Sequence, residues 1–209
     1  MWIFRLTLDL LFPSACYLCK KEGFSLCSSC VQNLSHSIQV LPHWIHTTYL
    51  YKDENVRSCL HQIKYYHRKD IVLPLVQASI DASLIDFVGT ENNTVLVPIP
   101  MHFGRKWSRG YNHASSIANT YGKLLNIPVN ENLLIRKKNS TQQATIKRVQ
   151  ERMKNVHNIF AVHQKNADQK TQNIILIDDT TTTHATLLEA KHVLEKTGYT
   201  NVKAITLAH

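Results

Sequence analysis

The sequence lacks any long apolar run, and this absence argues against a segment that spans a membrane. Its apolar start, residues 2–12, is too short for a bilayer and carries Arg5 and Asp9. These charges stand four residues apart, which is typical of a helix with one ion-paired polar side. No positively charged region precedes a clean apolar core, so we expect no secretory signal. An amphipathic helix that packs on its own protein is the simplest interpretation, and docking to a membrane or a partner is the alternative.

Acidic residues are few, and the 209-residue chain carries a formal net charge of +9. This balance favours an anionic partner, either a polyphosphate or a nucleic acid. Between Arg136 and Lys154, Glu151 is the single acid among seven basic residues. Such a run binds DNA, covers a bound polyphosphate or is a solvated helix face. Aromatic side chains elsewhere can stack on bases, although a core position is the alternative for each. The DNA-binding candidates are Lys138, Lys147, Arg148, Arg152, Tyr65 and Tyr66.

Cysteine is scarce, and four of the five cysteines form two C-x2-C pairs. Cys16 and Cys19 are separated by seven residues from Cys27 and Cys30. Two such pairs can close four thiolates around one zinc ion, and no open coordination position is implied, so the predicted zinc is structural. Two disulfides are the alternative and would require an oxidising compartment. Cys59 lies apart and is expected to be a buried thiol.

The segment with the clearest chemistry begins as four apolar residues, Ile174–Ile177, that run directly into Asp178 and Asp179. The hydroxyl-rich stretch Thr180–Thr183 follows, and a helical pattern opens at Ala185. Carboxylates at the end of a buried parallel strand can accept hydrogen bonds from two ribose hydroxyls. The loop amides at a helix N-terminus can bind a phosphate. We therefore predict a ribose-phosphate site, with a threonine-rich helix cap as the alternative.

This segment resembles the phosphoribosyl pyrophosphate (PRPP) motif of type I phosphoribosyltransferases, two acids followed by T-T-G-x-T. His184 stands where that motif has glycine. Histidine tolerates positive φ better than most residues, so we expect the loop to form at a cost of roughly 1–2 kcal/mol. Its ring would shield the site or contact the phosphate. The resemblance assigns PRPP binding to Asp178, Asp179, Thr181, Thr182, Thr183, His184, Ala185 and Thr186.

Short apolar strands alternate with helical patterns along residues 41–209, which favours an open, mostly parallel α/β sheet with helices on both faces. Ligands in such sheets bind at the carboxyl ends of the strands. We predict two domains, an N-terminal helix with a four-cysteine zinc module over residues 1–40 and a phosphoribosyltransferase-like domain over residues 41–209. Strands are expected at 47–51, 94–99, 132–135, 174–177 and 202–207, and helices at 55–66, 76–87, 114–125 and 185–197, with a polar helix and connector within 31–46.

Further motifs resemble the ComF-type competence family. Val97-Pro98-Ile99-Pro100, followed by the run from Arg109 to Ala114, is similar to that family's V-P-x-P…R-G-F-N-x-A signature. Ile63-Lys64-Tyr65 matches its L-K-Y element, and Thr141-x-Gln143 with Arg152-x-x-Asn155 and Phe160 follows in the same order. The resemblance implies a phosphoribosyltransferase-like domain in natural transformation. The family handles incoming single-stranded DNA on the cytoplasmic side of the inner membrane.

By the same resemblance, the loop after Pro100 would bind pyrophosphate. Met101 and His102 would lie along it, with Arg105 and Arg109 close enough to meet the diphosphate charge. A strand terminus and a solvated arginine are the alternatives for these features. Magnesium would be held mainly by PRPP itself, with carboxylates nearby.

Two functions fit these features. In the first, the chain is a DNA-uptake factor that binds PRPP or a related nucleotide and single-stranded DNA. In the second, it is a phosphoribosyltransferase that moves the phosphoribosyl group to a nitrogen acceptor. No short segment indicates a purine or pyrimidine pocket, and this absence favours the first.

Overall fold

The computed structural model describes residues 14–89, 93–101, 110–137, 158–163 and 172–209. The predicted N-terminal helix at residues 2–12 and most of the basic run 136–154 lie outside these residues. The candidate residues that also lie outside them are His102, Arg105, Arg109, Lys138, Lys147, Arg148 and Arg152.

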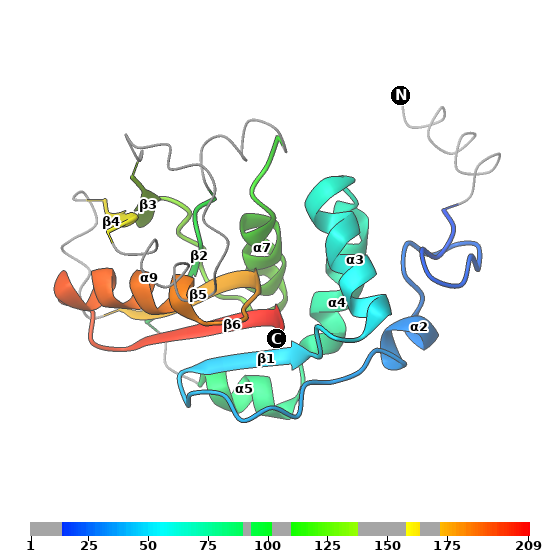
Figure 1. Ribbon diagram of the computed structural model, residues 1–209, viewed down its shortest axis with the longest axis horizontal. Coiled ribbons are helices and arrows are strands. Elements are labelled where there is room, and N and C mark those ends of the chain that lie inside the picture. The colour runs from blue at the N-terminus through cyan, green and yellow to red at the C-terminus, as the bar shows by residue number, and fades with distance from the viewer. Residues whose placement is uncertain (1–13, 90–92, 102–109, 138–157, 164–171) are drawn as a thin grey trace.

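A four-stranded parallel sheet forms the centre of the molecule (Figure 1). Its order is β1-β6-β5-β2, and each neighbouring pair runs parallel. This confirms the predicted parallel α/β architecture. The strands are β1 (Ile45–Tyr49), β2 (Thr94–Pro98), β5 (Asn173–Thr180) and β6 (Val202–Ala208).

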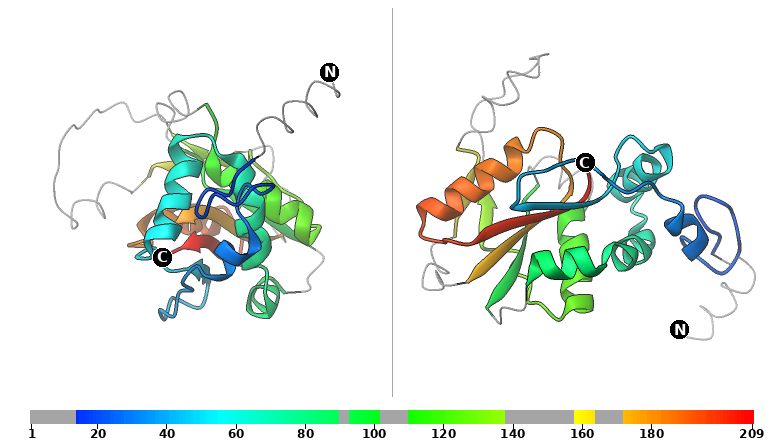
Figure 2. Two further views of the ribbon diagram at one scale, coloured as in Figure 1. Left: turned by 90° about the vertical axis from the view of Figure 1, so that its right-hand side faces the viewer. Right: turned by 90° about the horizontal axis from the view of Figure 1, so that it is seen from below.

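Helices cover both faces of the sheet, as the view from below in Figure 2 shows. Ile175 and Ile177 of β5 belong to one buried cluster, and Ile174 and Leu176 belong to another, because successive strand residues point to opposite faces. A strand buried on both sides needs an unbroken apolar run, which explains its sequence. The first face is covered by α3 (Glu54–Tyr65), α4 (Val72–Ser79) and α7 (His113–Leu125), and the second by α9 (Ala185–Lys196).

Three predicted elements differ from the structure. The strand expected at 132–135 is β3 (Leu134–Arg136), which pairs antiparallel with β4 (Phe160–Val162) in a separate two-stranded sheet. The helix expected at 76–87 is divided, because α5 (Ala82–Val88) starts afresh after Asp81, whose side chain accepts from Leu84 N–H. The polar helix expected within 31–46 is α2 (Ser28–Gln32), only five residues long. A short 3-10 helix, η1 (Lys69–Ile71), precedes α4.

The described N-terminal residues pack against the helices of the first face. Cys16, Leu26 and Val31 are buried in the same cluster as the apolar side of α3. The Tyr17 and Ser58 hydroxyl oxygens are 2.7 Å apart, which adds a polar contact to α3. The four-cysteine segment is therefore anchored on α3, at the end of the molecule away from α9 (Figure 1). Within the described part of the chain, none of the helices has the length and apolar character needed to cross a bilayer.

Candidate functional site

The two acids of the motif end β5, beside the end of β2. Pro98 of β2 pairs with Ile177, the residue before Asp178. A cavity of about 250 Å³ opens at this edge. The predicted residues that line it are Asp178, Asp179, Thr186, Met101 and Tyr65, and the lining residues not predicted for the site include Lys64, Asn112, His113 and Arg136.

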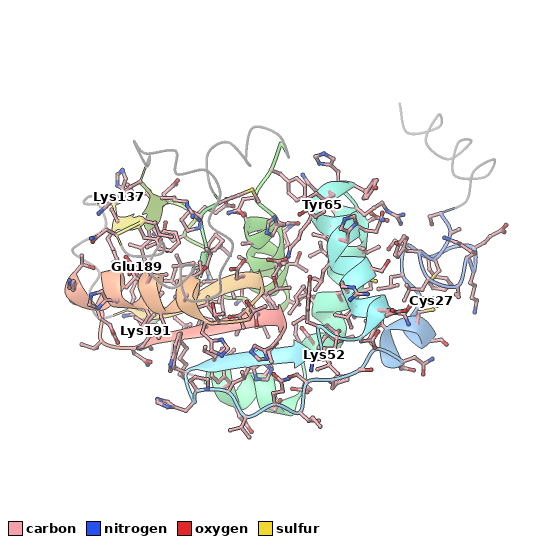
Figure 3. The ribbon with its side chains drawn as sticks, viewed as in Figure 1. Cys27, Lys52, Tyr65, Lys137, Glu189 and Lys191 are labelled. Carbon is pink, nitrogen blue, oxygen red and sulfur yellow. The ribbon has the colours of Figure 1, made fainter. Side chains whose placement is uncertain are left out.

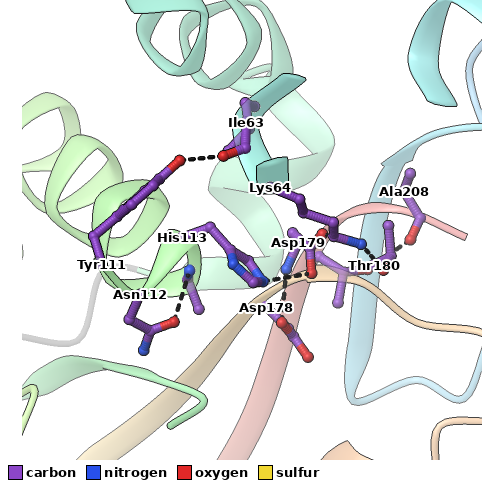
Figure 4. Close-up of polar contacts among 11 residues, drawn as sticks. Ile63, Lys64, Tyr111, Asn112, His113, Asp178, Asp179, Thr180 and Ala208 are labelled. Atoms are coloured by element: carbon purple, nitrogen blue, oxygen red, sulfur yellow. Dashed lines mark hydrogen bonds and ion pairs between the residues drawn. The ribbon is translucent and has the colours of Figure 1, made fainter. Parts of the chain in front are cut away.

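Asp179 is buried and already paired within the protein (Figure 4). Its carboxylate lies 2.5 Å from Lys64 Nζ and 3.3 Å from His113 Nε2. Burial works against its ionisation, but the His113 hydrogen bond and the Lys64 charge outweigh burial and hold its pKa below the ordinary value. The pKa of Lys64 is raised, because the Asp179 charge exceeds the opposing effect of burial. Asp179 is therefore held in place by two other residues that line the cavity.

Asp178 is half-buried and lines the same cavity. One carboxylate oxygen accepts a 2.9 Å hydrogen bond from the Asp179 backbone N–H. Burial and the neighbouring Asp179 charge both disfavour a second negative charge, so the pKa of Asp178 is raised well above its ordinary value. The two carboxyls consequently differ, since Asp179 is held in an ion-paired network and Asp178 lines the cavity and resists ionisation.

The loop after β5 leads directly to α9. Thr181 is buried, whereas Thr182 and Thr183 are exposed. Because the first amides of a helix have no partner within the helix, those of Ala185 and the next residues are available to an anion. The N-cap residue, His184, makes no side-chain cap bond that would satisfy them.

His184 has φ 56° and ψ 0°, the left-handed conformation that glycine adopts without strain. Its Nδ1 lies 3.0 Å from Thr181 Oγ1, and its ring stacks on His209 at 5.0 Å between centroids. Burial, and next the nearby His209, lower the pKa of His184, so the ring is neutral at pH 7. These contacts hold the ring against its own loop and β6 end.

Lys64, Asn112 and His113 have positions at the site that the sequence did not predict. Asn112 caps α7 by accepting from Ala114 N–H, and its amide donates to Ile99 C=O at 3.0 Å. This fastens the start of α7 to the end of β2. All three residues stand in the family-like elements, the Ile63-Lys64-Tyr65 match and the run from Arg109 to Ala114. The two motifs pointed to these positions in the sequence, but the spacing within them did not indicate what each side chain contacts.

The two DNA-binding candidates within the described chain, Tyr65 and Tyr66, are 53% and 61% exposed, so neither is a core residue. Figure 3 shows Tyr65 at the end of α3. The His61 ring lies beside both, with centroids 4.6 Å from Tyr65 and 5.7 Å from Tyr66. Three aromatic rings therefore stand together on the surface, next to the cavity.

The four paired cysteines converge in space. One ligand atom from each of Cys16, Cys19, Cys27 and Cys30 lies within 4.8 Å of the others. The Cys19 and Cys27 sulfurs are 3.6 Å apart, close to the roughly 3.8 Å that tetrahedral Zn–S bonds of about 2.3 Å require. All four are free thiols rather than disulfides. The predicted four-cysteine cluster is confirmed, and it can hold a zinc ion.

The electrostatics of this cluster also suit a cation. Burial opposes the Cys16 thiolate, but backbone N–H groups of Cys19, Cys27 and Leu18 outweigh it and lower the pKa to about 6. The pKa of Cys30 is instead raised, because burial and its cysteine neighbours disfavour another negative charge. A divalent cation would relieve that crowding. Cys59 is buried, as predicted, and burial raises its pKa to about 12.

Comparison with known proteins gives one curated relative. The chain is 29% identical over 113 residues to Competence protein F of Haemophilus influenzae, covering 54% of this chain and 49% of that protein. The matched part thus spans about half the length of the relative. No protein-family model matches the chain.

Two solved structures are similar to part of the chain. The glutamine PRPP amidotransferase of B. subtilis, complexed with ADP and GMP, matches at 15% identity and TM-score 0.41 over 66% of this chain and 25% of its own. A structure described as the allosteric regulatory enzyme of purine biosynthesis matches at 14% identity and TM-score 0.38, over 66% of this chain and 24% of its own. The similarity to Competence protein F agrees with the competence-family resemblance found in the motifs.

Proposed function

We propose that this chain is a DNA-uptake factor of natural transformation that binds a ribose-phosphate ligand, PRPP or a related nucleotide, together with single-stranded DNA. The proposal includes action at the cytoplasmic face of the inner membrane. The observation that carries it is the cavity at the ends of β2 and β5, which joins Asp178, the start of α9 and the exposed ring of Tyr65.

The cavity supplies what a ribose phosphate needs. Asp178 faces it and can accept hydrogen bonds from vicinal hydroxyls. Thr186, in the first turn of α9, lines the same cavity, so the helix N-terminus is available to the phosphate. Lys64 and Arg136 also line the cavity and add positive charge to it. These groups match a ligand that carries both hydroxyls and an anion.

Two metals belong to the proposal. Zinc would be structural and held by the four cysteines, whose sulfur separations fit it. Magnesium would arrive with the polyphosphate, and Asp178 and Asp179 are the carboxylates that would lie near it. Because Lys64 already neutralises Asp179, we assign the main magnesium contacts to the ligand.

Single-stranded DNA would bind through the basic run and the tyrosines. Tyr65, Tyr66 and His61 form the exposed stacking surface in the described chain, and stacking tolerates any base. The basic candidates Lys147, Arg148 and Arg152 lie outside the described residues. A titration of labelled single strands at rising salt tests this part, since affinity should fall with a log–log slope of roughly −0.7 per phosphate contacted. Duplex that binds more tightly than single strands would contradict it.

The alternative function is an active phosphoribosyltransferase. One observation favours it, a second hollow of about 520 Å³ that meets the cavity at Pro100, Met101 and Asn112 and could receive an acceptor. Its walls are polar side chains of α7, including Ser116 and Asn119. Steady pyrophosphate release from PRPP with a panel of nitrogen acceptors would establish this reaction. Binding of PRPP without release would support the uptake factor.

A further inference from the structure

The ribose-phosphate cavity and the aromatic surface of α3 meet at two residues. Lys64 and Tyr65 line the cavity, and the same two residues line a third hollow, of about 500 Å³, that runs along α3. His61, whose ring is tilted against that of Tyr65, lines that hollow one helical turn earlier, and Arg57 lines it two turns earlier. The cavity therefore adjoins a groove along α3 that carries aromatic and basic side chains.

We propose that cavity and groove form one site for the 5′-phosphorylated end of a single nucleic acid strand, so that PRPP and this end exclude each other. This inference rests on the proposed function and specifies the ligand of that site. The terminal 5′-phosphate and sugar would occupy the cavity, and the terminal base would stack on Tyr65. The following nucleotides would run along α3.

The size of the cavity favours placing the sugar phosphate inside it and the terminal base outside it. A cavity of about 250 Å³ is smaller than the roughly 300–1,000 Å³ typical of sites that enclose a whole drug-sized ligand. A sugar phosphate fits such a volume, and an attached base must leave it. Among the residues that line the cavity, Tyr65 carries an exposed ring, and rings of this kind stack on bases of any sequence.

Charge favours a strand end over the middle of a strand. The amides at a helix N-terminus bind a phosphate best when it presents several charged oxygens, and a terminal monoester has one more than an internal diester. Lys64 lies within reach of both parts, because its Nζ contacts Asp179 and Thr180 Oγ1 in the cavity while its chain borders the groove. Farther along, the exposed Arg57 can meet the next phosphodiester, since its contact with Glu54 is 3.6 Å long and exposed.

The experiment measures fluorescence anisotropy of two decamers of one sequence, labelled at the 3′ end and carrying either a 5′-phosphate or a 5′-hydroxyl. The full-length protein should bind the phosphorylated strand about tenfold more tightly, as one charge-assisted phosphate contact implies. Saturating PRPP with magnesium should remove this difference and leave the residual affinity of both strands equal. Equal binding of the two strands without PRPP would overturn the shared site, yet it would leave single-strand binding itself intact.

Two neighbouring tyrosines provide matched variants. Tyr65 lines the cavity and Tyr66 does not, although both are exposed beside His61. Tyr65→Ala should reduce the preference for the 5′-phosphate, whereas Tyr66→Ala should weaken both strands alike and keep their ratio. A loss of the ratio in Tyr66→Ala alone would contradict the path along Tyr65. If neither strand binds at low salt, the DNA part of the proposed function fails as well.

Discussion

Lys64 Nζ lies 2.5 Å from Asp179 Oδ2, so the second acid of the PRPP-like motif is neutralised from within the chain. The two residues are far apart in sequence, and their pairing joins the end of α3 to the end of β5. We therefore expect a change at Asp179 to perturb folding as well as binding, whereas Asp178 can be changed with less structural cost.

Lys64→Met should lower the free energy of unfolding by roughly 3 kcal/mol, because a buried carboxylate is left without its cation. Urea unfolding at pH 7 measures this difference. Lys52→Met is the control, since Lys52 is exposed and such surface changes stay within about 0.5 kcal/mol. Equal stability of the two variants would show that the Lys64–Asp179 pair contributes nothing net.

Asp178→Asn should stabilise the protein at neutral pH, because the folded state disfavours a negative charge on Asp178 beside Asp179. The pKa of Asp178 is raised in the folded state, so the folded protein holds its proton more tightly than the unfolded chain. The resulting stability is present below the unfolded pKa and is lost as pH rises through the folded pKa. Asparagine cannot ionise, so the advantage of the variant should appear as pH rises and vanish in acid.

Asp53→Asn should show the opposite pH trend. Backbone N–H groups of Ser35 and Asn55 donate to the Asp53 carboxylate and outweigh burial, which lowers its pKa. Its contribution is present above the unfolded pKa and is lost as pH falls through the folded one. Unfolding curves from pH 3 to pH 8 should therefore show that the variant is destabilised at neutral pH and converges with the wild type in acid. Parallel trends for the two aspartates would contradict the assignment.

A comparison of His184→Ala with His184→Gly separates the effect of backbone strain from the loss of the ring contacts. Both variants lose the ring contacts with Thr181 and His209, but only alanine keeps a Cβ at φ 56°. The glycine variant should therefore be more stable than the alanine variant by about 1 kcal/mol. Thermal unfolding measures the difference, and an alanine variant as stable as glycine would show that this position stores no strain.

Cys27→Ser should abolish zinc binding, since three remaining thiolates leave the tetrahedral site incomplete. Metal analysis of reduced, tag-free protein should find one zinc per wild-type chain and almost none in the variant. Cys59→Ala should keep its zinc, because Cys59 is not part of the four-cysteine cluster. Wild-type protein that contains no zinc after purification would contradict the assignment.

Secondary structure was predicted most accurately where the sequence pattern lies within one continuous segment. The apolar run of β5 and the spacing of α3 and α7 gave the sheet and its helices, because burial on both faces leaves a continuous signal. The prediction failed for the helix at 76–87, where Asp81 restarts the chain as α5 by a cap bond. It also placed β3 without its partner β4, since antiparallel pairing between segments distant in sequence leaves no local pattern.

The candidate site likewise contains features that the sequence predicted and contacts that it did not. The carboxylates and the cysteine pairs were visible, because their chemistry lies within a few adjacent residues. Lys64 and His113 were missed as partners of Asp179, because that network depends on how three separate elements meet. His184 has positive φ, a conformation that the motif's glycine adopts freely and that histidine was expected to tolerate. The predicted division into two domains at residue 40 stays a prediction.

The most direct test of the account is the thermal shift caused by PRPP with magnesium in wild-type protein and in Asp178→Asn. A ligand at about 100 times its Kd should raise the wild-type melting temperature by roughly 5–10 °C. The variant should start from a higher melting temperature at neutral pH and show almost no shift, because it has lost the carboxylate that faces the cavity. An equal shift in both proteins would contradict the assignment of this cavity as the ribose-phosphate site.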